Sequence, residues 1–217
     1  MKFAKNDRIV FVGDSITDSN RNYEALPARW SSWGDGYVQV INSYTTAFYP
    51  ELELMVVNQG VSGNRVRDLK KRWQKDVLEL APDWVAVMVG VNDVCRHFDG
   101  VFYQEDQVSV AEFRETLSQL VAQTMRETKG VFLLSAFLLT EDPEEPMRKM
   151  LAEYNRQTAE VAEALGAVYV DVQKEMDRYL AVQSGYYLSI DRVHPSLAGH
   201  LLIAKAWLKA AGLGGML

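Results

Sequence analysis

Three residues with strong potential for chemistry lie far apart in the sequence: a serine, a histidine and an aspartate. Ser15 follows the apolar run 9–12 and stands in the string Gly-Asp-Ser-Ile-Thr-Asp at residues 13–18. Asp191 and His194 lie three residues apart in Asp-Arg-Val-His-Pro at residues 191–195. A serine hydroxyl becomes a nucleophile when a histidine accepts its proton and an acid orients the ring. These residues therefore predict acyl transfer by Ser15, with His194 as base and Asp191, on a tight turn, orienting it.

Acyl transfer also needs hydrogen-bond donors for the negative charge that develops on the carbonyl oxygen. Gly63 lies in Gly-Val-Ser-Gly-Asn at residues 60–64, and Asn92 lies in Gly-Val-Asn-Asp at residues 90–93. A glycine leaves its backbone N–H unobstructed and tolerates positive φ, and an asparagine amide is a neutral donor. We expect the backbone N–H groups of Ser15 and Gly63 and the Asn92 side chain to form the oxyanion hole, with Gly60 as the alternative to Gly63.

The elements that must bring these residues together alternate along the chain. Short apolar runs typical of buried parallel strands occupy residues 9–12, 54–58, 84–89, 131–137 and 168–170. Apolar residues at helical spacing lie between or after them, at residues 37–48, 66–80, 110–121, 147–165 and 197–208. This alternation predicts an α/β fold, a three-layer α/β/α sandwich with a parallel sheet of about five strands, as one domain over residues 1–217.

Right-handed crossovers place the carboxyl ends of parallel strands at one rim of the sheet, where ligands bind. Ser15 follows the first predicted strand, Gly63 the second and Asn92 the third, while Asp191 and His194 precede the last helix. Four segments distant in sequence are thus expected to converge there. Two longer irregular stretches, residues 19–35 and 97–109, are the loops expected to carry specificity.

The chain resembles the SGNH (GDSL-type) hydrolase family, whose four letters fall on Ser15, Gly63, Asn92 and His194. The resemblance covers nearly the whole chain and rests on the blocks GDSITD, NQGVSGN, GVND and DRVHPS in family order. It favours Gly63 over Gly60, because the family motif aligns on the glycine before Asn64. It implies a flavodoxin-like sheet, a serine esterase mechanism, and no metal or organic cofactor.

Within that family, the chain is most similar to carbohydrate acetylesterases, notably acetylxylan esterases. The similar stretches are YPELEL, VVNQGVSGN, VRDLKKRW, APDW and DRVHPSLAGH. The resemblance implies a small acylated substrate, namely an acetylated carbohydrate such as a xylo-oligosaccharide, and a homo-oligomer. A GDSL-type lipolytic esterase or acylhydrolase acting on lipids or thioesters is the alternative, although the sequence shows no long apolar lid.

Residues that flank the predicted site are candidates for substrate binding. Asp14, Asn64, Arg65 and Trp33 are assigned to this role, with a turn carboxylate (Asp14) and a surface ion pair (Arg65) as the alternative interpretations. Trp33, with Trp30 and Tyr37, forms an aromatic group suited either to stacking on a sugar or to a subunit interface. Tyr186 and Tyr187 share that ambiguity.

Several residues with chemical potential are assigned structural roles instead. His97 is interpreted as a solvated loop histidine and His200, inside the last helix, as a structural one. Cys95 is the only cysteine, and no histidine-based triad is organised around it, so we interpret it as a packing residue. Asp93 is expected to accept backbone N–H groups beside Asn92.

The composition and the remaining motifs exclude other functions. A net charge of −6 without a basic stripe argues against nucleic-acid and anionic-membrane partners. A single cysteine and the absence of a secretory signal predict a cytoplasmic protein. Residues 13–18 mimic the Gly-Asp-x-x-Asp motif of metal-dependent phosphoesterases, but three histidines supply a two-metal site poorly. Neither Walker A nor Gly-x-Gly-x-x-Gly follows the first strand, which disfavours a nucleotide-binding module.

Overall fold

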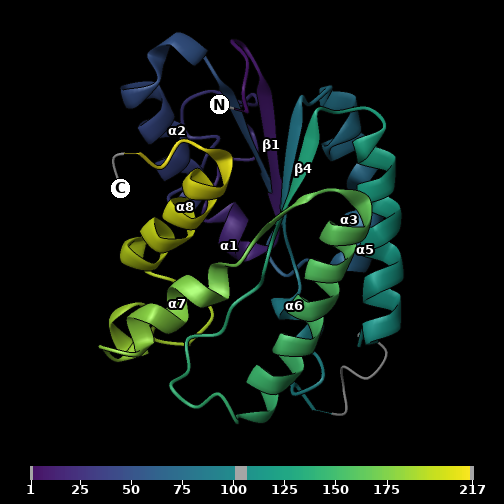
Figure 1. Ribbon diagram of the computed structural model, residues 1–217, viewed down its shortest axis with the longest axis vertical. Helices are drawn as coiled ribbons and strands as arrows, with labels where there is room; N and C mark the ends of the chain where they lie inside the picture. Colours follow the sequence, from purple (N-terminus) through teal and green to yellow (C-terminus); the bar gives the residue numbers. More distant parts are fainter. Residues whose placement is uncertain (1, 101–106, 216–217) are drawn as a thin grey trace.

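A computed structural model describes residues 2–100 and 107–215 and has a parallel sheet at its centre (Figure 1). The strand order is β2-β1-β3-β4-β5, and all pairs are parallel. The strands are β1 (Arg8–Gly13), β2 (Met55–Gly60), β3 (Trp84–Met88), β4 (Gly130–Leu134) and β5 (Val168–Val170). This flavodoxin-like order has its switch point at β1 and β3, where α/β proteins bind ligands. The predicted fold class is confirmed.

The sheet is buried because its central strands are apolar on both faces. In β1, Val10 pairs with Val57 of β2 and with Val85 of β3, and all three are at most 1% exposed. Burial of both faces explains why the strands read as continuous apolar runs and show no alternation. The register brings Gly13, at the end of β1, beside Gly60 and Met88, so β1, β2 and β3 end at the same edge.

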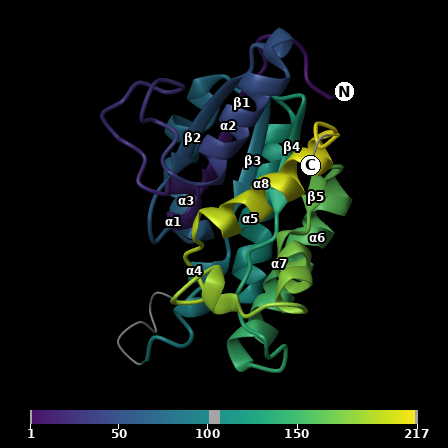
Figure 2. The same cartoon turned by 90° about the vertical axis from the view of Figure 1, so that its left-hand side faces the viewer.

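Helices cover both faces of the sheet, as Figures 1 and 2 show. The helices α2, α7 and α8 lie on one face and α3, α5 and α6 on the other, while the short α1 and α4 lie where β1 and β3 end. The bounds are α1 (Ser15–Asp18), α2 (Tyr37–Phe48), α3 (Val66–Asp76), α4 (Val91–Cys95), α5 (Val110–Met125), α6 (Pro146–Leu165), α7 (Val172–Leu180) and α8 (Leu197–Ala211).

The long helices have the terminal signals expected from their sequences. Ser109 caps α5 by accepting the N–H of Glu112, and α6 begins with Pro146, whose missing N–H costs nothing at that position. Gly166 and Gly212 end α6 and α8 in left-handed conformations with φ of 70° and 79°. The helix predicted over residues 37–48 is observed with those bounds, and α6 begins one residue before its predicted start.

Short elements and some boundaries differ from the sequence-based expectation. The helices α1, α4 and α7 were not predicted, because four to nine residues contain too few turns to show a period. The strand expected over residues 131–137 ends at Leu134, where its pairing with both β3 and β5 ends. The helix expected over residues 66–80 ends at Asp76, and a separate 3₁₀ turn covers Leu78–Leu80. Of the irregular stretch 97–109, residues 101–106 lie outside the described residues.

Across residues 2–100 and 107–215, no helix is both long enough and apolar enough to cross a bilayer.

Candidate active site

Ser15 begins helix α1 at the point where β1 leaves the sheet. The Asp14 side chain accepts the N–H of Ile16 at 3.0 Å, and the Asp14 carbonyl accepts those of Thr17 and Asp18. These bonds occupy the N–H groups of residues 16–18, and the N–H of Ser15 takes part in none of them. The turn requires glycine at residue 13, because a Cβ there would lie 2.3 Å from Thr17 Oγ1. The local sequence thus presents the Ser15 hydroxyl at the rim.

The three residues of the predicted triad are connected by hydrogen bonds. Ser15 Oγ lies 2.9 Å from His194 Nε2, and His194 Nδ1 lies 2.7 Å from Asp191 Oδ2. A carboxylate only accepts, so Nδ1 carries the proton and Nε2 is free to accept the Ser15 hydroxyl. The arrangement is that of a nucleophile, a general base and an orienting acid.

Asp191 is held in place by its own turn. Its Oδ1 atom accepts the N–H groups of Val193 at 2.9 Å and His194 at 2.8 Å, and the Ser189 hydroxyl at 2.9 Å. The turn is possible because Arg192 adopts a left-handed conformation with φ of 69°. Partial burial opposes ionisation of Asp191, but these hydrogen bonds and the one from His194 hold its pKa well below the usual range. Asp191 is thus an ionised acceptor for the ring.

Two of the predicted oxyanion donors follow the strands on either side of β1, Gly63 on the loop after β2 and Asn92 in helix α4 after β3. Gly63 has a φ of 78°, and no atom lies within 4 Å of the position where a Cβ would stand. Its surroundings are open, which suits approach of a substrate carbonyl. The Asn92 amide donates one N–H to the carbonyl of Asn64 at 3.1 Å, which ties α4 to the loop that contains Gly63. The second N–H of that amide remains for a ligand.

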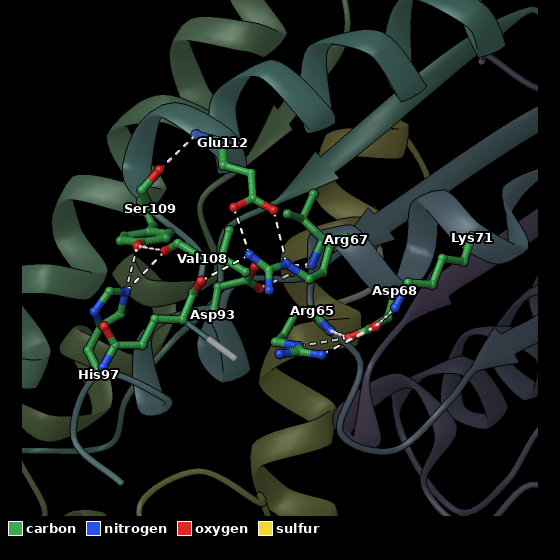
Figure 3. A network of polar contacts seen from close by, with 12 residues as sticks. Arg65, Arg67, Asp68, Lys71, Asp93, His97, Val108, Ser109 and Glu112 are labelled. Atoms are coloured by element: carbon green, nitrogen blue, oxygen red, sulfur yellow. Dashed lines mark hydrogen bonds and ion pairs between the residues drawn. The ribbon is translucent and has the colours of Figure 1, made fainter. Parts of the chain in front are cut away.

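The buried carboxylate of Asp93 also holds this loop in place (Figure 3). Asp93 is fully buried, and both of its oxygens accept the N–H of Val66, at 3.0 and 3.3 Å. Burial raises the pKa of Asp93 to about 7. Because Asp93 follows Asn92 and Val66 follows the Gly63 loop, this contact fixes two of the predicted oxyanion donors, Asn92 and Gly63, relative to each other. The expectation that Asp93 accepts backbone N–H groups is confirmed.

Ion pairs brace the start of α3 further from the rim. Arg65 contacts Asp68 at 2.8 Å, and Arg67 forms two bonds with Glu112 of α5, at 2.9 and 2.7 Å (Figure 3). A bidentate arginine–carboxylate pair fixes geometry as well as adding energy. The helix that follows the Gly63 loop is therefore held rigidly against α5.

A cavity of about 370 Å³ opens beside the Ser15 hydroxyl. Its walls come from α1 and the residues after it, from the β2–α3 loop and from the start of α8. They are formed by Ser15, Ile16, Asp18, Ser19, Asn20, Ser62, His194, Pro195 and His200. Sequence reasoning missed Ser19, Asn20 and Ser62, and it interpreted His200 as structural. The only signal for His200 was its position six residues after His194, in the first turn of the helix that follows.

The residues predicted to bind substrate do not form the walls of this cavity. Asp14 is 1% exposed and caps α1, so the expectation that it contacts substrate is corrected; burial raises its pKa to about 7. Asn64 Oδ1 accepts a bond from Arg72, and Arg65 is paired with Asp68. Trp33 donates its indole N–H to the Val56 carbonyl at 2.7 Å and packs against the core. For Asn64, Arg65 and Trp33, substrate contact stays a prediction.

Other candidate side chains have roles in the fold. Tyr37 is fully buried and contacts Thr17, so it belongs to neither a sugar platform nor an interface. His97 is half-buried, and its Nε2 atom bonds to the Val108 carbonyl at 3.0 Å. Burial raises the pKa of Cys95 to about 11, which disfavours the reactive thiolate. Within the described ranges, no three His, Cys, Asp or Glu side chains gather where they could hold a metal ion.

At the carboxyl rim of the parallel sheet, a serine is hydrogen-bonded to a histidine, and the histidine to a carboxylate. This arrangement places the protein in the class of serine-dependent carboxylic ester hydrolases. Residues 11–202 match the GDSL-like Lipase/Acylhydrolase family, and the chain belongs to that family. The resemblance noted in the sequence is therefore confirmed.

Known relatives extend over almost the full chain. An acetylxylan esterase of Geobacillus stearothermophilus is 40% identical over 98% of this chain and 97% of its own. The crystal structure of LAE5, an alpha/beta hydrolase enzyme from the metagenome of Lake Arreo, Spain, is 43% identical over 99% of both chains, with a TM-score of 0.95. Structures of the Geobacillus enzyme, Axe2, cover 98% of this chain at the same TM-score, and three are described as catalytic mutants: S15A, D191A and H194A.

Proposed function

We propose that this protein removes acetyl groups from carbohydrates such as xylo-oligosaccharides through an acyl-enzyme on Ser15. His194 accepts the Ser15 proton as the hydroxyl attacks the ester carbonyl, and returns it to the departing sugar oxygen. Water then attacks the acyl-enzyme, with His194 again as base and Asp191 orienting the ring. The N–H groups of Ser15 and Gly63 and the Asn92 amide stabilise the oxyanion in both steps.

The observation that carries this proposal is the chain of bonds from Ser15 through His194 to Asp191, at 2.9 and 2.7 Å. The relative of known activity supports the acetyl-carbohydrate assignment, since it is an acetylxylan esterase. Its catalytic mutants carry the same residue numbers as Ser15, Asp191 and His194 in this chain. The cavity beside Ser15 has several hydroxyl, amide and imidazole groups on its walls, which suits a polar alcohol.

The test is acetate release from acetylated xylo-oligosaccharides, with the Ser15→Ala variant as the blank and 4-nitrophenyl acetate as a second substrate. We expect release by the native protein and a loss of at least about 10⁴-fold in kcat for the variant on both substrates. Cleavage of 4-nitrophenyl acetate without release from the sugar would refute the carbohydrate assignment and direct the search to lipid or thioester acyl donors. Activity retained by the variant would refute Ser15 as nucleophile.

We also propose that the chain assembles into a homo-oligomer and works in the cytoplasm. Trp30 and Ile190 are each 88% exposed and Tyr186 is 73% exposed, and such apolar side chains are enriched in interfaces. A lone cysteine suits a reducing compartment. Light scattering coupled to size exclusion measures the assembly, and a mass of one chain would refute it. Fractionation of expressing cells tests the compartment.

A further inference from the structure

Two consecutive residues on the cavity wall adopt an uncommon backbone conformation. Ser19 and Asn20 have φ of 42° and 62°, in the left-handed region, immediately after the helix that starts with Ser15. A left-handed backbone is uncommon for a residue such as Ser19, and it persists where the surroundings impose it, often at functional sites. The position of Ser19 is therefore enforced by its neighbours.

The segment 34–37 supplies that enforcement. The N–H of Asp35 donates to the Ser19 carbonyl at 2.6 Å. Residues 34 and 36 are glycines because a Cβ at Gly34 would lie 2.4 Å from the Ser19 carbonyl oxygen, and one at Gly36 would lie 2.7 Å from Ser19 Oγ. The same Cβ at Gly36 would lie 2.8 Å from His200 Cε1. The two glycines thus let this segment close over Ser19 and His200 together.

His200 determines which way the Ser19 hydroxyl can donate. Its Nδ1 atom accepts the N–H of Tyr37 at 3.1 Å, so a neutral ring carries its proton on Nε2. Burial lowers the pKa of His200 to about 4, which keeps the ring neutral near pH 7. Nε2 lies 3.4 Å from Ser19 Oγ and donates to it. The Ser19 oxygen is thereby an acceptor on the His200 side, and its own proton remains available to the cavity that Ser15 and His194 share.

We propose that Ser19 is a specificity-determining residue whose hydroxyl donates a hydrogen bond to the alcohol portion of the substrate. His200 is the positioning residue that orients it. The group recognised is an oxygen next to the acylated one, as on a polyol or sugar whose neighbouring hydroxyl is free. Simple alkyl and aryl esters have no such oxygen and do not use this contact. This inference rests on the proposed function, because it concerns the alcohol that leaves from the Ser15 site.

The experiment measures kcat/KM of Ser19→Ala and Ser19→Gly on three acetates: an acetylated xylo-oligosaccharide, glycerol monoacetate and 4-nitrophenyl acetate. We expect both variants to lose about fivefold to tenfold on the two polyol esters, the effect of one lost hydrogen bond, and less than twofold on the aryl ester. Ser19→Gly relieves the left-handed strain, so its melting temperature should exceed that of Ser19→Ala. Activity and stability therefore change independently if the hydroxyl is what matters.

Ser31 provides a matched control. It is a serine of the same loop, also left-handed with φ of 65°, but it is exposed and lies outside the cavity wall. Ser31→Ala and Ser31→Gly should leave all three rates within twofold.

The other outcomes test the role of Ser19 and the carbohydrate assignment separately. Equal losses on polyol and aryl esters, or no loss on any of them, would overturn the role of Ser19 in recognising the alcohol. If the native protein cleaves glycerol monoacetate but not the xylo-oligosaccharide, the carbohydrate assignment fails. The glycerol and aryl esters then still decide whether Ser19 recognises a neighbouring oxygen.

Discussion

Two histidines six residues apart show how surroundings decide the chemistry of one side chain. His194 lies on an exposed turn and bonds through Nδ1 to the Asp191 carboxylate, which stabilises an imidazolium as it forms. His200 is 5% exposed and bonds to a backbone N–H and a serine hydroxyl, and within residues 2–100 and 107–215 no carboxylate bonds to its ring. Burial keeps His200 neutral, so it can orient a neighbour but is a poor proton acceptor. Its carboxylate partner and its contact with Ser15 make His194 a base, whereas His200 contacts Ser19 and is a positioning group.

The largest effect is expected from substitutions that test the comparison of His194 with His200. His194→Ala removes the proposed base, and we expect kcat on 4-nitrophenyl acetate to fall by about 10⁴-fold or more. His200→Asn keeps an acceptor near the position of Nδ1 for the Tyr37 N–H, and its rate should stay within about threefold. Steady-state kinetics at pH 8 measures both. Similar losses in the two variants would contradict the separation of roles.

The second prediction concerns the carboxylate that distinguishes the two rings. Asp191→Asn can still accept backbone N–H groups, but it no longer selects the tautomer with the proton on Nδ1. We expect kcat to fall by about 10³–10⁴-fold while the circular dichroism spectrum and melting temperature change little. A variant with near-native kcat would show that His194 needs no orienting acid.

A smaller effect is expected for the buried carboxylate beneath the oxyanion loop. Asp93→Ala removes the acceptor of the Val66 N–H and loosens the Gly63 loop relative to Asn92, so kcat should fall by about 10–100-fold with KM little changed. Asp93→Asn keeps one acceptor oxygen and should recover most of the rate. A rise in KM with unchanged kcat would mean that Asp93 affects substrate binding instead.

The smallest effect is a change in the free energy of unfolding with pH. The pKa of His200 is about 4 in the folded protein and about 6.5 in an unfolded chain, so the unfolded state binds the extra proton first. The contribution of a neutral His200 is fully present above pH 6.5. It is lost as pH falls toward 4, by about 3 kcal/mol in total.

Urea unfolding of the native protein and of His200→Asn, at pH 8 and pH 5, measures this contribution as a difference between the two proteins. The difference is needed because Asp14 and Asp93, with raised pKa values of about 7, have the opposite sign and destabilise the fold as pH rises. We expect the stability of the native protein relative to the variant to decrease at pH 5. No change in that relative stability would show that His200 titrates normally in the folded state.

Much of the fold was predictable because its elements carry local signals. Such signals need only neighbouring residues to be recognised. Examples are the apolar run before Ser15, the proline that begins α6 and the glycines that end α6 and α8. The short helices were not predictable, since α1 depends on a cap by Asp14 and on a close approach of Gly13 to Met88 of another strand. The strand β4 was predicted too long because its end depends on where its pairing with β3 and β5 stops.

For the site, the nucleophile turn, the Asp191–His194 spacing and the segments with Gly63 and Asn92 could be read from the sequence, since each is a local motif and together they favour one chemistry. Only the tertiary structure decided that Asp14 is buried, that Trp33 packs on the core and that Ser19, Asn20, Ser62 and His200 form the cavity wall. Burial and hydrogen-bond partners arise from contacts between segments far apart in the chain. Those contacts, and not residue types alone, determine which polar groups remain free to meet a substrate.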